Sequence, residues 1–227
     1  MPVTTCIFDA YGTLFDVTAA ARAASTEPGG GALATGWQKL ADDWRRKQLE
    51  YTWLRAIMGQ HADFAQVTAD GLDWALDAAG LADPALRARL LALYEVLPAY
   101  PEVPSVLAAL KTAGVPRAIL SNGTPAMLSA AARSAGIADL LDDCLSVEAV
   151  CVFKPDARVY ALVTVRFACL PADVLFISSN GWDVAGAAGF GFRTVWVNRS
   201  CLPVDRLPGR PDHILNDLAP VPGIALT

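Results

Sequence analysis

The pattern of hydrophobic and polar positions divides the chain into a helical stretch and a region where short strands alternate with helices. Apolar runs rich in β-branched and aromatic residues predict buried strands at residues 4–8, 117–120, 174–177 and 194–197, with a weaker strand at 144–147. Helix-compatible segments separate the later runs. This alternation predicts a parallel sheet with right-handed crossovers, in which residues 194–197 form the last strand.

Residues 16–97 carry no strand pattern and are predicted to be helical throughout. The longest helix is expected over residues 36–58, with others near 68–79 and from 83 to about 97. A loop of proline and three glycines at residues 28–31 precedes them. Six large apolar side chains recur at helical spacing along the longest helix and should face a core: Trp37, Leu40, Trp44, Tyr51, Leu54 and Met58.

Arg45 lies off that apolar stripe and shares a second one with Leu49 and Trp53, at positions i, i+4 and i+8. A cation among apolar neighbours fits the wall of a cleft. Periodicity alone favours the alternative, an arginine whose stem covers apolar surface while its charged head reaches water. Both alternatives stay open.

Composition limits the classes of function. The chain has 227 residues, 54% of them hydrophobic, which is enough for a sizeable core. A net charge of -5 without a basic run argues against a nucleic-acid partner, and no apolar segment reaches the roughly 20 residues that span a bilayer. Without a secretory pattern or paired CxxC spacing, we expect a cytoplasmic protein whose cysteines are reduced: Cys6, Cys144, Cys151, Cys169 and Cys201. The distant His61 and His213 give little support to a histidine metal site or a serine triad.

Polar side chains stand at four places where predicted strands end or loops follow them. They are Asp9 with Thr13, Ser121 with Asn122, Lys154, and Ser178 with Asn180 and Asp183. Singly, each has an ordinary structural explanation as a turn, cap or solvated residue. The carboxyl ends of parallel strands share one edge of a sheet, where ligands bind. We therefore expect these groups to form one site.

Four segments together resemble the motifs of the haloacid dehalogenase superfamily. They are Asp-Ala-Tyr-Gly-Thr-Leu at residues 9–14, Ser-Asn-Gly at 121–123, Phe-Lys-Pro at 153–155 and Ser-Ser-Asn-Gly-Trp-Asp at 178–183. The stretch Trp-Arg-Arg-Lys-Gln-Leu-Glu-Tyr at 44–51 resembles the helical block of L-2-haloacid dehalogenases. The resemblance implies an α/β fold, with a Rossmann-like parallel-sheet core and an inserted all-helical cap domain. The core would comprise residues 1–15 and 98–227, and the cap residues 16–97.

Departures from the phosphatase pattern of this superfamily point to the substrate. The phosphatases of this superfamily carry the pattern Asp-x-Asp at the first motif, and their second acid protonates the leaving alkoxide. This chain has Tyr11 in place of that second acid. A halide is stable as an anion and leaves without a proton. Serine and asparagine at residues 178–180 replace the acids expected ahead of Asp183, and hard divalent cations prefer several carboxylate oxygens. We therefore expect neither a metal nor another cofactor.

The resemblance implies hydrolysis of L-2-haloalkanoic acids to D-2-hydroxy acids by water, through an ester on Asp9. Lys154 would orient Asp9, Asp183 would activate water together with Asn180, and Ser121 would bind the substrate carboxylate. The resemblance also implies a halide cradle of Arg45, Asn122 and Trp182, supporting roles for Thr13, Tyr160 and Ser178, and an apolar wall of Tyr11, Leu49 and Phe64.

Two other functions remain open on the sequence. One is a phosphatase-type hydrolase that uses the same Asp9 and requires Mg²⁺, and the other is a non-catalytic binding protein that kept the fold. The preferred halogen and the chain length of the acid stay undetermined, and a homodimer is plausible from the resemblance. Arg46 stands where the family pattern usually has glutamine, which leaves the charge of the pocket open.

Overall fold

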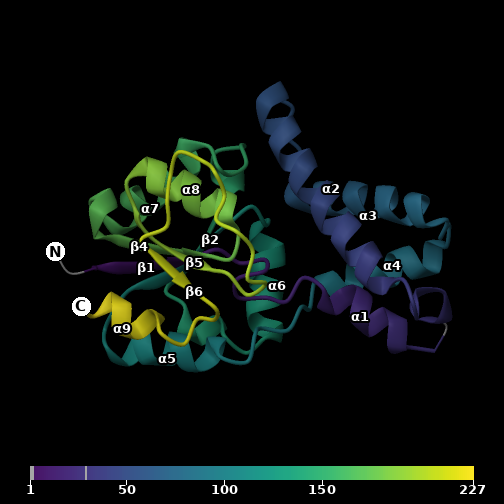
Figure 1. The fold of residues 1–227 in the computed structure, drawn as a ribbon, viewed down its shortest axis with the longest axis horizontal. Helices are drawn as coiled ribbons and strands as arrows, with labels where there is room; N and C mark the ends of the chain where they lie inside the picture. Colours follow the sequence, from purple (N-terminus) through teal and green to yellow (C-terminus); the bar gives the residue numbers. More distant parts are fainter. Residues whose placement is uncertain (1–2, 29) are drawn as a thin grey trace.

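The computed structural model describes residues 3–28 and 30–227 and has a six-stranded parallel sheet at its centre (Figure 1). The strands lie in the order β3-β2-β1-β4-β5-β6. Their bounds are β1 Thr5–Phe8, β2 Arg117–Ser121, β3 Asp143–Ser146, β4 Val174–Ser178, β5 Arg193–Val197 and β6 His213–Leu215. The predictions that fall on residues 1, 2 and 29, in the first core segment and the glycine loop, lie outside the described residues.

The predicted strands are confirmed, but the last strand is not the one expected. Strands β1, β2 and β4 are buried along their whole length, as their near-continuous apolar sequences predict. The sheet does not end at β5, because β6 pairs with it in parallel through Val195 and His213. The β6 strand has only three residues, none of them fully buried, so it lacks the apolar run by which the others are recognised.

Helices cover both faces of the sheet. In Figure 1, α7 and α8 lie above it and α5 and α9 below it. The bounds are α5 Val103–Thr112, α6 Pro125–Ser134, α7 Ala157–Phe167, α8 Gly181–Phe190 and α9 Val221–Ala225. The α6 helix begins as predicted, since the Thr124 side chain accepts a hydrogen bond from the backbone of Met127 and Pro125 follows it.

The helical block lies beside the sheet as a separate group of helices, as Figure 1 shows. It contains α1 Ala19–Thr26, α2 Trp37–Met58, α3 Phe64–Ala79 and α4 Pro84–Tyr94. Two of these bounds differ from the expected ones. The α3 helix begins four residues early because Asp63 caps it by accepting from the backbone of Gln66, and α4 ends at Tyr94 rather than near Leu97.

The expectation that all six apolar residues of α2 face a core is wrong at the end of the helix. Leu40 and Trp44 are buried, but Leu54 is 44% exposed and Met58 60% exposed. Helix α2 has 22 residues whereas its partner α3 has 16, and in Figure 1 its end projects beyond the neighbouring helices. The helical spacing of apolar residues therefore continues beyond the part of α2 that neighbouring helices cover.

Two adjacent crossings of the chain connect the helical block to the rest of the protein. Phe15 and Ala99 form an antiparallel bridge, and the backbone N–H of Tyr100 donates to the carbonyl of Leu14 at 2.9 Å. The proposed domain boundaries at residues 16 and 97 adjoin this bridge. Within the described part of the chain, no helix is long and apolar enough to cross a membrane.

Candidate active site

Asp9 follows β1 directly, at the edge of the sheet where the carboxyl ends of the parallel strands meet. Its backbone N–H donates to Ile177 of β4 at 2.9 Å, which fixes its position between two strands. The residue is only 6% exposed. Its Oδ2 accepts hydrogen bonds from Thr13 Oγ1 and Asn180 Nδ2, both at 2.9 Å. The carboxylate is therefore oriented by neutral donors on one oxygen.

Lys154 lies between Asp9 and Asp183 and carries the positive charge of this site. Its Nζ donates to Asp9 Oδ1 at 3.2 Å and to Asp183 Oδ2 at 2.8 Å. Lys154 is 1% exposed and Asp183 is fully buried. Burial alone would lower the pKa of Lys154, but the two carboxylates outweigh it and raise that pKa. One cation therefore holds two acids that would otherwise repel each other.

Asp183 has the most perturbed carboxyl of the site. Complete burial raises its pKa to about 6, against the opposing effect of Lys154. Tyr160 of α7 donates its hydroxyl proton to Asp183 Oδ1 at 2.8 Å. Burial also raises the pKa of Tyr160, so the phenol remains a neutral donor. A carboxyl that ionises near neutral pH is suited to accept a proton during a reaction.

The end of β2 closes another side of the site. Ser121 is fully buried, and its Oγ accepts from the backbone of Gly123 at 3.1 Å. Asn122 Oδ1 accepts from the backbone N–H of Lys154 at 3.0 Å, which ties the two loops together. A side chain at Gly123 would meet the ring of Tyr11 at 2.8 Å. Glycine at this position lets the loop approach the first motif closely.

The end of β4 completes the arrangement. The buried Ser178 Oγ accepts from the backbone of Asn180 at 3.1 Å and so holds the turn into α8. Asn180 then uses both ends of its amide, because Nδ2 donates to Asp9 while Oδ1 accepts from Arg45 at 3.3 Å. Asn180 thereby links Asp9 to the helical block.

Arg45 crosses from α2 to the sheet edge, so the cleft-wall alternative describes this side chain. Its Nη2 donates to the carbonyl of Tyr11 at 3.1 Å as well as to Asn180. Arg46, by contrast, is half exposed and pairs with Asp43 of the same helix at 2.9 Å. The departure at Arg46 therefore adds no charge at Asp9.

Aromatic residues surround the polar groups. Tyr11 packs on Phe64 of α3, with ring centroids 5.4 Å apart. Trp182 of α8 meets Trp53 of α2 edge-on at 5.4 Å. Leu49, on the same stripe as Arg45 and Trp53, is half buried. These contacts make an apolar wall between the helical block and the sheet.

A family model described as haloacid dehalogenase-like hydrolase matches residues 3–191, which include all of these groups. The chain belongs to this family. The hydrolase is 43% identical to (S)-2-haloacid dehalogenase 1 of Pseudomonas sp. (strain CBS-3), covering 99% of this chain and 97% of the relative. It is 47% identical to (S)-2-haloacid dehalogenase of Xanthobacter autotrophicus, covering 85% and 74% of the two chains.

Solved structures resemble this hydrolase over its whole length. The L-2-haloacid dehalogenase of Xanthobacter autotrophicus with chloropropionic acid covalently bound gives a TM-score of 0.87 at 38% identity, covering 97% of each chain. A dehalogenase with an intermediate complex gives a TM-score of 0.94 at 39% identity, covering 100% of this chain and 98% of the other. Both similarities extend over the helical block as well as the sheet.

The acids of this hydrolase do not fit the Mg²⁺ site that phosphatases of the superfamily use. Oxygens of Asp9 and Asp183 already accept hydrogen bonds from Lys154, whose ammonium occupies the position between them. Among the described residues, no group of three or more histidines, cysteines, aspartates and glutamates could hold a metal. Serine and asparagine at residues 178–180 also leave Asp183 without the neighbouring acids from which a hard cation would take further oxygens. That the protein works without a metal stays a prediction.

Several residues at this site were not predicted from the sequence. Ser179 donates its backbone N–H to Thr13 Oγ1 at 2.8 Å, and Gln48 Oε1 accepts from Arg45 Nη1 at 2.8 Å. Ser179 stands inside the fourth motif, so its proximity to the other site residues was a usable signal. Gln48 is a polar residue in the middle of a helix, and nothing in the local pattern distinguishes it from a solvated one.

Proposed function

We propose that this protein is an (S)-2-haloacid dehalogenase, which hydrolyses L-2-haloalkanoic acids to D-2-hydroxy acids without a metal. The observation that carries the proposal is the environment of Asp9. The carboxylate is held by Lys154, Thr13 and Asn180, and no second acid follows it at Tyr11. Burial keeps the pKa of the Tyr11 phenol well above its usual range, so it is a poor proton donor to an alkoxide. A leaving group that needs no proton suits this site.

The first step is a displacement at carbon. An oxygen of Asp9 attacks C2 of the haloacid, a carbon–oxygen bond forms, and the halide leaves with the electrons of the carbon–halogen bond. Lys154 offsets the negative charge of Asp9 and thereby reduces its repulsion of an anionic substrate. Ser121 Oγ accepts from Gly123, so its own hydrogen serves as a donor to the substrate carboxylate.

The second step is hydrolysis of the ester. Water attacks the carboxyl carbon of Asp9 and gives its proton to Asp183, with Asn180 holding the ester. The bond between that carbon and the oxygen joined to C2 then breaks, and the D-2-hydroxy acid leaves with this former Asp9 oxygen and with the proton that Asp183 returns. The water oxygen stays in the carboxyl of Asp9, which loses the second proton of the water to solvent and so becomes a carboxylate again. Because C2 is attacked once, its configuration inverts once. Tyr160 and Lys154 position Asp183 for this role, and Thr13 and Ser178 support Asp9 and Asn180.

The departing halide is received by Arg45, Asn122 and Trp182. Three N–H groups of Arg45 donate to Gln48, Tyr11 and Asn180, whereas the guanidinium has five. Nε keeps its hydrogen as a donor for the anion. Tyr11, Leu49 and Phe64 line the apolar side, where the alkyl group of the substrate lies.

Halide release from L- and D-2-chloropropionate, with and without EDTA, tests this function beside hydrolysis of p-nitrophenyl phosphate with Mg²⁺. We expect release from the L-form alone, unaffected by EDTA. Asp9→Asn should abolish it, whereas Asp139→Asn, the same change at an exposed residue, should not. Phosphate hydrolysis alone would establish a phosphatase, and no turnover of any of these substrates would favour a binding protein.

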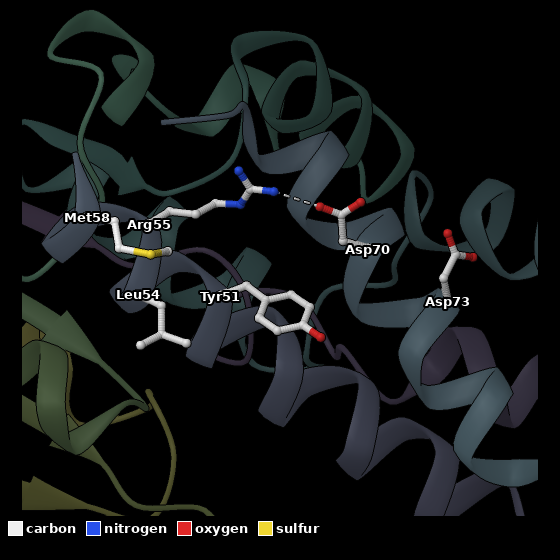
Figure 2. Close-up of a pocket in the computed structure, with 6 residues that line it drawn as sticks. All are labelled: Tyr51, Leu54, Arg55, Met58, Asp70 and Asp73. Carbon is white, nitrogen blue, oxygen red and sulfur yellow. Dashed lines mark hydrogen bonds and ion pairs between the residues drawn. The ribbon is translucent and has the colours of Figure 1, made fainter. Parts of the chain in front are cut away.

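We also propose a homodimer formed through the outer face of the helical block. Figure 2 shows the groove there, of about 550 Å³, between Tyr51 and Arg55 of α2 and Asp70 of α3. Exposed Leu54 and Met58 give it an apolar side, and its charges of both signs suit a surface that meets a second copy of itself. Sedimentation should give a dimer that Met58→Glu dissociates.

We also propose a cytoplasmic location, because a reducing compartment suits the five free cysteines. Cell fractionation tests this location.

A further inference from the structure

We propose that Gln48 is a positioning residue, which holds the guanidinium of Arg45 in the orientation that receives the leaving halide. The inference rests on the proposed function, in which Arg45 binds that halide. Gln48 lies one turn after Arg45 on α2 and is 1% exposed. Its contacts form a hydrogen-bonded network inside the helical block.

The Arg45 guanidinium is fixed at both of its terminal nitrogens. Nη2 donates to Tyr11 and Asn180, which lie at the sheet edge, and Nη1 donates to Gln48 Oε1 at 2.8 Å. Only the last acceptor belongs to the helical block. Without it, only the contacts at the sheet edge would limit rotation of the long arginine side chain, and the Nε–H would no longer be held in one direction.

The amide of Gln48 has one orientation, because its neighbour Thr68 determines which end donates. Thr68 Oγ1 gives its single hydrogen to the carbonyl of Phe64 at 2.6 Å. The atom of Gln48 that lies 2.7 Å from Thr68 Oγ1 must therefore be the donor Nε2. Oε1 then faces Arg45 as an acceptor. Thr68 thus acts on Arg45 through Gln48.

Tyr94 of α4 supports the same amide from a third helix. Its hydroxyl lies 3.1 Å from Gln48 Nε2 and 3.3 Å from Oε1. Its ring stacks on Tyr11 at 5.5 Å, and Trp44 packs on it at 5.0 Å. The network therefore also touches Tyr11, whose carbonyl accepts from Arg45.

Close packing of α2 and α3 brings these groups within reach. A side chain at Gly71 would meet the backbone nitrogen of Gln48 at 3.0 Å. Glycine lets the two helices approach at this turn, one turn after Thr68. A short contact between helices is what allows a threonine hydroxyl to reach a glutamine in the neighbouring helix.

An amide serves this role better than a carboxylate would. The three acceptors of Arg45 are all neutral, two amide oxygens and one peptide carbonyl. The positive charge is therefore held in place without being neutralised, and it stays available to an anion. Glutamate at position 48 would accept the same hydrogen bond but would compete with the halide for that charge.

The test measures carbon–halogen cleavage in a single turnover of L-2-chloropropionate, together with inhibition by bromide. Loss of a hydrogen bond to a charged group predicts that Gln48→Met slows cleavage about 10- to 100-fold. KM should change less than about threefold, and bromide should inhibit more weakly by a factor similar to the loss in cleavage. Gln48→Glu should weaken bromide inhibition as well. Gln60→Met, the same change at an exposed glutamine, should alter neither quantity.

A second pair of variants covers the case in which Gln48→Met does not fold. Thr68→Val removes the oxygen that orients the amide, so it should slow cleavage and weaken bromide inhibition. Thr68→Ser keeps that oxygen and should restore both. Thr112→Val is the matched change at an exposed threonine. A purely structural role for Thr68 would lower the folded fraction without changing the bromide inhibition constant of the folded enzyme.

The outcomes separate this inference from the proposed function. If the unsubstituted protein releases no halide from either enantiomer, the function fails and the basis for a role of Gln48 goes with it. If it releases halide normally, wild-type cleavage and bromide inhibition in Gln48→Met or Thr68→Val overturn the inference alone. Slower ester hydrolysis with unchanged cleavage would also overturn it, because Arg45 acts on the halide in the first step.

Discussion

Replacing Lys154 with methionine tests whether one buried cation holds the site together. Lys154→Met keeps the length and most of the volume of the side chain but removes its charge. Asp9 and Asp183 then remain as two nearly or fully buried carboxylates without their shared partner. We expect loss of activity and a large loss of stability whose size depends on pH.

The distances set the scale of the effect. At an effective dielectric constant of about 20, charges at 2.8 and 3.2 Å attract with about 6 and 5 kcal/mol. Desolvation of the three groups cancels much of this gross attraction. Removing one partner of a buried ion pair costs about 3–5 kcal/mol, because the remaining charge is uncompensated. We expect a loss in that range at pH 8.

The loss should shrink as the pH falls. Lys154 is the main influence that lowers the pKa of Asp183, so its removal raises that pKa further above about 6. A carboxyl whose folded pKa is raised favours folding at low pH, and this contribution disappears as the pH rises through the folded pKa. The difference between variant and wild type should therefore grow from pH 6 toward pH 8, by up to about 1.4 kcal/mol per pH unit.

Urea denaturation at pH 5, 6, 7 and 8, followed by circular dichroism, measures the free energy of unfolding. Lys111→Met, the same change at an exposed lysine, should stay within about 0.5 kcal/mol of wild type at every pH. Adding Asp183→Asn to Lys154→Met should recover stability at pH 8, because it removes the uncompensated charge. An equal loss at pH 5 and pH 8, or no recovery in the double variant, refutes the reasoning.

Two further predictions concern catalysis. Turnover should fall as the pH decreases through about 6, because Asp183 must be ionised to accept a proton from water. A rate that stays constant from pH 8 to pH 5 contradicts the role of Asp183 as the base. Arg45→Ala should keep the circular dichroism spectrum of the wild type and lose roughly 100-fold or more in turnover. Arg46→Ala, which alters a half-exposed neighbour, should keep its turnover. Normal halide release by Arg45→Ala refutes the role of Arg45 in binding the halide.

The sequence was sufficient to predict the sheet, the helical block and the strand ends that meet at Asp9. Strong apolar runs identify buried parallel strands, and a ligand edge follows from their direction. The β6 strand was not predicted, because its three half-exposed or exposed residues, His213–Leu215, do not form an apolar run. Its place depends on pairing with the edge of β5, which is a property of the assembled sheet.

One supporting group of the site, Gln48, could not be predicted for a related reason. Arg45 stood out as a cation among apolar neighbours, but its partner Gln48 did not, because burial of a polar residue depends on packing between helices. Leu54 and Met58 were predicted to be buried but are exposed. Their spacing matches a buried stripe, but the helix extends beyond the neighbours that would cover it. Periodicity indicates which side chains share a face, and only the tertiary structure determines what covers that face.

The bridge between Phe15 and Ala99 brings the two ends of the helical block together. The chain leaves the sheet and returns to it at one place, so a short turn could join these two residues without moving any strand. Such a shortened protein would keep Asp9, Lys154 and Asp183 but lose Arg45, and it would uncover Tyr11. A different insertion at the same junction would bring its own side chains over an unchanged Asp9. New substrates could therefore be acquired by exchanging what lies between these two residues.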